Sequence, residues 1–316
     1  MNMKSFLPLL LIIALIGCKQ ENKSNSSVSA PVPNILLPDI LQVEYMVFFD
    51  TSSGDSWQKS LNAENFINEF RKNVYSGDIA VYSPFYSDTN QARIPLNNIE
   101  VDLGKLIDEK SLKWGNYITS SLGFIEEWNF DTSGFQFSKN VRWWYPGFFS
   151  TSDSSYHRMF HVFNQNASEI LAENIIYEIN FSENRSDFRY LDYKRFFSWL
   201  VNSALNKKIH VFAPDNPNSE FRPEEIKSRL GEQLVNVSDQ DNSGNIVTST
   251  AIQKFNIEEL TGIIFIEDWY FDINTGSISK KVLGFAPVRH YEDENGNMLK
   301  SIPFVYYTGT KKCSIL

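Results

Sequence analysis

Two glutamates recur in matching aromatic segments and are the first candidates for chemistry. Glu126 stands in F-I-E-E-W-N-F-D (124–131), and Glu267 stands in F-I-E-D-W-Y-F-D (265–272). Alternate residues of a strand share one face, so each carboxylate is predicted to lie among aromatic side chains. A half-buried carboxylate needs a partner, because an unpaired charge is costly away from water.

Lys139 and Lys280 on the returning strands can provide that partner. One register places each lysine opposite a tryptophan as a cation–π pair, and a shift of two residues places it opposite the glutamate as an ion pair. General acid–base catalysis is the alternative role, but an active site is rarely needed twice. We therefore predict a structural signature and no enzyme. Its residues are Glu126, Trp128, Asp131, Lys139, Glu267, Trp269, Asp272 and Lys280.

An aromatic run follows the first of these segments and has no counterpart in the second. The stretch W-W-Y-P-G-F-F contains Trp143, Trp144, Tyr145, Phe148 and Phe149. Aromatic residues dominate protein-binding hot spots and also stack on sugars, so the run is a candidate interface or ligand-binding surface. Burial between the two halves of the chain is the alternative interpretation.

Metal and cofactor signals are weak. His157 and His161 have the i,i+4 spacing of helical metal ligands, but no third ligand stands nearby. The segment 239–244 resembles the start of a calcium loop, yet Thr250 occupies the position that requires a bidentate glutamate. The sequence contains no nucleophile elbow, phosphate-binding loop or dinucleotide fingerprint. We predict neither a metal site nor a cofactor.

The elements that must position these residues recur in the same order. Ten of 23 aligned positions are identical between the segments that begin at Phe124 and Phe265. This predicts a duplicated module, over 35–150 and 151–316. Each copy is expected to run helix, short strand, second helix and β-hairpin, which gives an α+β fold with antiparallel sheets. The expected helical faces are Phe66, Ile67, Phe70 and Val74, and Phe197, Leu200, Val201 and Ala204; the expected short strands are 79–82 and 209–212.

Composition narrows the class of protein. The chain has 316 residues, of which 42% are hydrophobic and 21% charged, as in an ordinary globular protein. Its formal net charge is −9, and no basic stripe is present. Nucleic acid is therefore excluded as a partner, because phosphate contacts need clustered lysine and arginine.

The N-terminal segment predicts a lipid anchor. Residues 1–17 combine one lysine with a short apolar run, which is typical of a signal peptide. The run closes as L-I-G-C, which resembles a bacterial lipobox and implies cleavage before Cys18 and acylation of its sulfur. Residues 18–34 form the acylated cysteine and a flexible tether. Lys19 favours the outer membrane by analogy with lipoprotein sorting, with the protein on the periplasmic face or alternatively on the cell surface.

Three stretches of the second copy carry a family resemblance: the segment 265–272, the V-L-G-F-A-P-V stretch at 282–288 and the closing segment 302–307. They are similar to the signature of the GldN/PorN family. Members are periplasmic subunits of the type IX secretion and gliding-motility machinery and build a ring with a lipoprotein partner. The chain departs from the family in its own lipobox and in 277–281, which lacks an arginine-rich strand, so it resembles a divergent, lipoprotein variant.

The resemblance implies a non-enzymatic outer-membrane lipoprotein that acts as an assembly or accessory component of that machinery. Membrane contact through Cys18 and protein partners, among them secretion-ring components, are expected, and an oligomer is compatible with this role. The family has no known catalytic residues, so the resemblance implies none here. The alternative function is a surface lipoprotein that binds a ligand or glycan through the aromatic run.

Overall fold

The computed structural model describes residues 41–49, 61–84, 93–104, 112–150, 152–181, 188, 191–240, 246–293 and 295–315. The expected signal peptide, Cys18 and the tether lie outside these residues. No helix in the described part of the chain is both long and apolar enough to cross a bilayer.

The helices of the described residues begin and end at recognisable sequence signals. They are α1 (Ala63–Ser76), α3 (Leu96–Leu103), α4 (Tyr193–Leu205) and α5 (Pro223–Arg229). The Asn62 side chain accepts a hydrogen bond from the backbone N–H of Asn65 at the start of α1, and Gly77 ends that helix at φ 84°. The apolar faces expected for α1 and α4 are buried, which confirms the helical periodicity.

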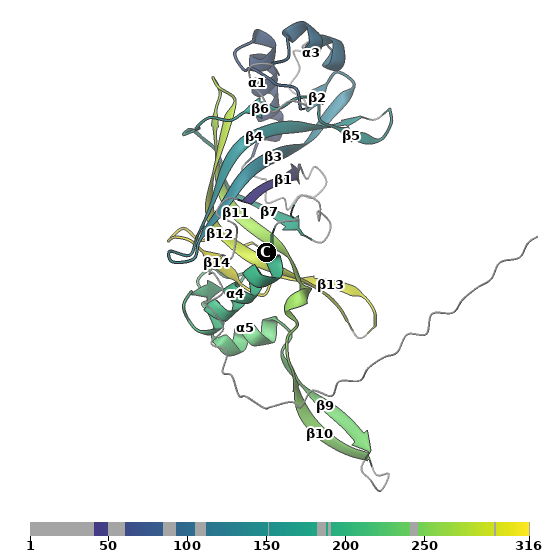
Figure 1. Cartoon of the computed structure of the whole chain (residues 1–316), viewed down its shortest axis with the longest axis vertical. Coiled ribbons are helices and arrows are strands. Elements are labelled where there is room, and N and C mark those ends of the chain that lie inside the picture. The colour runs from purple at the N-terminus through teal and green to yellow at the C-terminus, as the bar shows by residue number, and fades with distance from the viewer. Residues whose placement is uncertain are drawn as a thin grey trace, which may run out of the picture. The chain divides into compact units, whose positions relative to one another are not determined.

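The first large sheet is antiparallel and holds six strands of the N-terminal half. Their bounds are β1 (Leu41–Phe48), β2 (Lys113–Trp114), β3 (Tyr117–Asp131), β4 (Gln136–Ser150), β5 (Ser155–His157) and β6 (Val162–Phe163). The order is β1-β3-β4-β5, with β2 on β3 and β6 on β4. The long β3–β4 hairpin dominates this sheet (Figure 1).

The second large sheet repeats this plan in the C-terminal half. Its strands are β7 (Ile170–Asn180), β8 (Val211–Phe212), β11 (Leu260–Asp272), β12 (Ser277–Glu292), β13 (Met298–Ser301) and β14 (Val305–Tyr307). The order is β7-β11-β12-β14-β8, with β13 on β12. A single turn of 3₁₀ helix, η1 (Ile257–Glu259), leads into β11.

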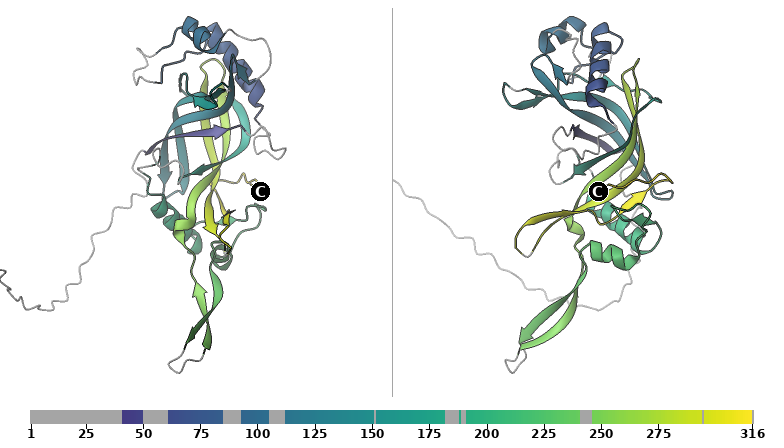
Figure 2. Two further views of the ribbon diagram at one scale, coloured as in Figure 1. Left: turned by 90° about the vertical axis from the view of Figure 1, so that its right-hand side faces the viewer. Right: turned by 180° about the vertical axis from the view of Figure 1, so that it is seen from behind.

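A separate two-stranded hairpin consists of β9 (Gln233–Gln240) and β10 (Ile246–Gln253). We call it the arm. It extends away from the two large sheets in every view (Figures 1 and 2). All eight residues of β10 are exposed to solvent.

The expected antiparallel sheets are confirmed, and the fold is a β-rich α+β fold. The module order expected from the sequence is incomplete, because β1 and β7 precede the first helix of each half. The segment 79–82 forms only an isolated bridge at Tyr82, which pairs with Arg93 and His161. Ile79 and Val81 are nevertheless buried. The alternation of apolar residues in this segment therefore reflects burial of its side chains and not pairing with a neighbouring strand.

The two halves share one hydrophobic core, and their elements interlock reciprocally. Phe130 near the tip of the first hairpin packs on Trp199 of α4, with ring centroids 5.1 Å apart. Phe271 near the tip of the second hairpin packs on Phe66 of α1 at 4.9 Å. Each hairpin therefore completes its core on a helix of the other half.

The tight turns of the two hairpins explain the repeated aspartates. Asp131 accepts hydrogen bonds from the backbone N–H groups of Ser133 and Gly134, and Asp272 accepts one from Asn274. An aspartate that binds the backbone two residues onward favours a turn. The side chains of Asp131 and Asp272 thus stabilise the turns of the two hairpins.

Candidate functional site

Two glutamates and two lysines meet between the large sheets with fully buried side chains. Glu126 and Lys139 come from β3 and β4, and Glu267 and Lys280 come from β11 and β12. We call these four residues the buried quartet. Each hairpin contributes one acid and one base, and all four side chains are 0% exposed.

The ion pairs of the buried quartet cross between the halves of the chain. Lys280 Nζ lies 2.8 Å from Glu126 Oε1, and Lys139 Nζ lies 2.7 Å from Glu267 Oε1. The acid of each hairpin thus finds its base on the other hairpin. Such reciprocity is the pattern of an isologous interface, in which the same surface is used on both sides.

Two tyrosines, Tyr45 from β1 and Tyr177 from β7, bridge the two ion pairs of the buried quartet. Tyr45 Oη lies 2.7 Å from Glu126 Oε2 and 3.0 Å from Lys280 Nζ. Tyr177 Oη lies 2.9 Å from Glu267 Oε2 and 2.7 Å from Lys139 Nζ. The two hydroxyl oxygens are 2.9 Å apart. Each hydroxyl has one hydrogen, so it donates either to its glutamate or to the other tyrosine at any moment.

Tryptophan and phenylalanine enclose these charges. Trp128 and Trp269 each donate an indole N–H to the glutamate of their own strand at 2.8 Å. Lys139 Nζ lies 3.1 Å from the ring centroid of Phe265, and Lys280 Nζ lies 3.1 Å from that of Phe124. Aromatic faces attract cations, so these rings add to the ion pairs while excluding water.

Burial and pairing set the protonation of the cluster. Burial alone raises the pKa of Glu126, but Lys280 and Lys139, with hydrogen bonds from Lys280 and Trp128, outweigh it and hold the pKa below its usual value. Burial lowers the pKa of Lys139 to about 8, although Glu267 and Glu126 oppose this effect. Burial and then the neighbouring carboxylates raise the pKa values of both tyrosines, so both hydroxyls stay protonated.

The same β-bulge shapes both hairpins beside the glutamates. The register shifts between Ile125 and Glu126 on β3, and between Ile266 and Glu267 on β11. A bulge locally increases strand twist and re-aims side chains. In both hairpins it lies immediately before the glutamate that points into the core.

The sequence predicted part of this arrangement. Trp128 lies opposite Lys139 and Trp269 opposite Lys280, which is the cation–π register of the two alternatives. The cross-half ion pairs and Tyr45 and Tyr177 were missed. Alternating apolar residues in L-Q-V-E-Y-M-V (41–47) were the signal that could have revealed β1 and its tyrosine.

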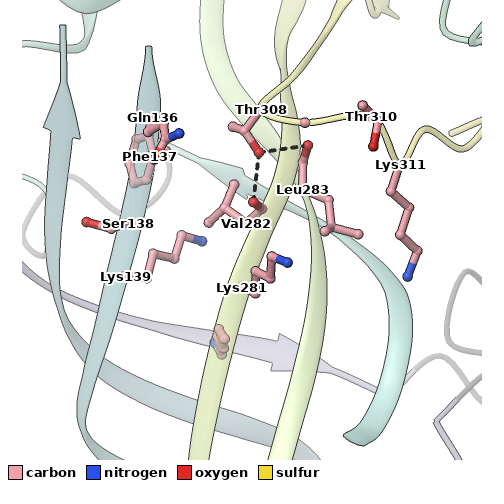
Figure 3. A pocket seen from close by; sticks show the side chains of 12 residues that line it. Gln136, Phe137, Ser138, Lys139, Lys281, Val282, Leu283, Thr308, Thr310 and Lys311 are labelled. Carbon is pink, nitrogen blue, oxygen red and sulfur yellow. Dashed lines mark hydrogen bonds between the residues drawn. The ribbon is translucent and has the colours of Figure 1, made fainter. Parts of the chain in front are cut away.

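A groove of about 500 Å³ opens beside the buried quartet. It lies between β4 and β12 and is bordered on one side by residues 308–311 (Figure 3). Thr308 fixes that segment by donating to the carbonyl oxygens of Val282 and Leu283, and Lys281 is exposed in the groove. The side chains of Lys139 and Lys280 stay covered, so the charges of the buried quartet are not presented to a bound molecule.

The aromatic run divides between the two faces of β4. Trp144 and Phe148 are 0% exposed in the core, and Tyr145 is buried on the opposite face, where its hydroxyl donates to Glu44 at 2.8 Å. Trp143 and Phe149 are partly buried. Three of the five rings are therefore buried, and of these Trp144 lies between the halves, where it packs on Phe66 and Phe271.

The two histidines do not share a helix. His157 ends the short strand β5 and contacts Asp153 and Ser155, whereas His161 forms a bridge with Tyr82. Within the described ranges, no group of three or more His, Cys, Asp or Glu side chains is placed to hold a metal ion. Residues 241–245 of the calcium-like segment lie outside the described residues.

Acid is expected to destabilise the protein partly through Glu126. The folded-state pKa of this carboxyl lies below its unfolded value of about 4.5. Its stabilisation is therefore present above pH 4.5 and is lost as pH falls through the folded-state pKa. The urea midpoint should drop on acidification and drop less steeply in the double variant Glu126→Gln/Lys280→Met. Glu127→Gln, which changes a partly exposed neighbour, should keep the native slope, and an equal slope in the double variant would contradict this assignment.

Comparison with known proteins shows that the second half of the chain is similar to a known family. Residues 166–313 match the family model of GldN, described as gliding motility associated protein GldN. The matched range includes Glu267 and Lys280 of the buried quartet, together with Tyr177 and Trp269, which contact it. The chain has no match among curated proteins.

Proposed function

Taking residues 166–313 as a GldN-type module, we propose that the protein is a non-enzymatic assembly or accessory component of the gliding-motility and type IX secretion machinery. The family match is the observation that carries this proposal. Members of the family that the sequence resembles work as parts of a secretion complex, so the partners of this chain are other proteins of that complex.

The geometry of the site supports a structural role. Glu126 and Glu267, the two candidate acids, are enclosed and ion-paired to lysines of the opposite half. A general acid or base must come within hydrogen-bond reach of its substrate, and these carboxylates are covered on every side by the aromatic core. Their ion pairs hold the two halves of the chain together.

The proposal includes the membrane anchor and the repeat. The protein is attached to the outer membrane through lipid on Cys18, on the periplasmic face, and residues 18–34 act as its tether. Two related modules, 35–150 and 151–316, form the body. The matching bulges, turns and reciprocal ion pairs of the two hairpins support the presence of two related modules. The strands β5 and β6, which pair with β4, extend the first sheet to residue 163.

Gentle detergent extraction from the native membranes tests the proposal. We expect the protein to migrate in a particle far larger than one or two chains, with gliding or secretion proteins identified in it by mass spectrometry. A Glu127→Gln variant, which changes only a partly exposed side chain, should behave in the same way. Recovery of the protein as a monomer or simple dimer without such partners would overturn the assignment.

A further inference from the structure

The arm carries an apolar surface that the body of the protein does not cover. Its exposed apolar side chains are Leu234 (72%), Val237 (43%), Ile246 (75%), Val247 (51%) and Ile252 (62%). An isolated two-stranded hairpin is marginally stable in water. An arm of this composition therefore gains stability from a partner.

The outer edge of β10 lacks the usual protection against pairing. Among the described residues β10 pairs only with β9, and its eight residues I-V-T-S-T-A-I-Q include no charge and no proline. The pairing with β9 contains no bulge. Native proteins normally blunt an open edge with charges, proline or bulges, so this edge has the features of a strand that is meant to pair.

The sequence of β10 is self-complementary about Ser249. Antiparallel pairing of two copies centred on this residue places Ile246 opposite Ile252 of the second copy, and Thr248 opposite Thr250. Val247 then faces Ala251, and Ser249 faces its own equivalent on the two-fold axis. Over residues 246–252, apolar residues meet apolar residues and hydroxyls meet hydroxyls, which are favourable cross-strand pairs.

The paired arrangement also extends the existing apolar contacts. Leu234 on β9 lies opposite Ile252 on β10. In the paired form Ile246 of the second copy joins that row, so three large aliphatic side chains stand side by side on one face. The two-fold axis generates the same row a second time, and the four strands form one sheet.

The edge of β9 does not offer an equivalent register. Centring on Asn236 sets Leu234 against Ser238, and centring on Val237 sets Leu234 against Gln240. Asp239 is the single charge of the two arm strands, and the second register places it opposite a valine. The two edges therefore differ in their fitness for self-pairing.

From these observations we propose that the protein forms a two-fold symmetric dimer through antiparallel β10–β10 pairing centred on Ser249. Both copies carry the same net charge of −9, and the uncharged edge lets them pair without setting like charges opposite each other. A symmetric contact of this kind closes on itself, so it yields a dimer and not a growing fibre. The dimer does not depend on the proposed secretion role.

Cysteine cross-linking of the full chain tests the register. In a Cys313→Ser background, Ser249→Cys places two thiols on the axis, where opposite Cα atoms are about 4.5–5.5 Å apart and within the range of a disulfide. We expect Ser249→Cys to form a covalent dimer on mild oxidation in the membrane. Ser238→Cys, the matched control on β9, should stay monomeric on a denaturing gel. Equal cross-linking of both variants, or of neither, would overturn the proposal.

Charge exchange provides a second test that does not rely on oxidation. Ser249→Lys or Ser249→Glu alone sets like charges directly opposite each other, which destabilises the pair. Recovery of untagged by tagged copies should fall about tenfold or more, which a loss of about 1.4 kcal/mol produces. Co-expression of the lysine and glutamate variants should restore it, and Ser238→Lys should leave it unchanged. Unaltered recovery in the single variants would contradict the dimer. The test of the secretion role is separate, because the presence or absence of the large secretion particle does not depend on β10 pairing.

Discussion

Replacement of Lys280 by methionine is expected to lower the free energy of unfolding by about 3–5 kcal/mol. Methionine is unbranched and one atom shorter than lysine, so it fills most of the same space but leaves Glu126 buried without its cation at 2.8 Å. Lys139→Met should cost a similar amount, because its partner Glu267 is held at 2.7 Å in equivalent surroundings. Urea denaturation followed by tryptophan fluorescence at neutral pH measures both.

A double-mutant cycle separates the pair from its surroundings. Adding Glu126→Gln to Lys280→Met should recover much of the lost stability, since the unpaired charge is then removed. The partly exposed pair of Glu127 and Arg142, 3.4 Å apart, is the control, and Arg142→Met should cost at most about 1 kcal/mol. Equal costs for Lys280→Met and Arg142→Met would contradict the importance of the buried quartet. If Lys280→Met is insoluble, greater soluble yield of the double variant reports the same coupling.

Replacement of Cys18 by serine is expected to abolish lipid attachment. Acylation requires the thiol of this residue, and no other group in the signal-peptide junction can replace it. Growth with labelled palmitate should give a labelled native protein and an unlabelled variant, and the variant should disappear from the outer-membrane fraction. Stable anchoring takes more than one acyl chain, which lipoprotein processing supplies.

Cys313→Ser is the matched control for this experiment. It removes the other thiol of the chain and should leave both labelling and fractionation unchanged. Persistent labelling of the Cys18→Ser variant would show that the lipobox assignment is wrong. Loss of labelling in Cys313→Ser would place the acyl group at the other end of the sequence.

Local features of the fold were accessible from the sequence because their causes are local. Asp131 and Asp272 mark turns by binding their own backbone, and the helical spacing of Phe66, Phe70 and Val74 marks the buried face of α1. The opposition of Trp128 and Lys139 follows from the short turn between their strands. Each of these depends on residues a few positions apart.

The buried quartet depends on residues that no local rule connects. Register within one hairpin offers Lys139 only to its own hairpin, whereas its partner Glu267 belongs to the other. The pairing emerges once Phe130 and Phe271 carry the hairpin tips onto helices of the opposite halves. The prediction of a strand at 79–82 was wrong because its alternating apolar residues are buried without regular pairing to a second strand.

The crossing of the ion pairs also imposes an order of events on a chain made from its N-terminus. Tyr45 and Lys280, which touch in the finished protein, are separated by 235 residues. Glu126 and Lys139 leave the ribosome long before the residues that neutralise them, and until then their hydration opposes burial. Contacts so distant in sequence make folding slow. The ion pairs of the first hairpin are therefore completed only after the last quarter of the chain has been made.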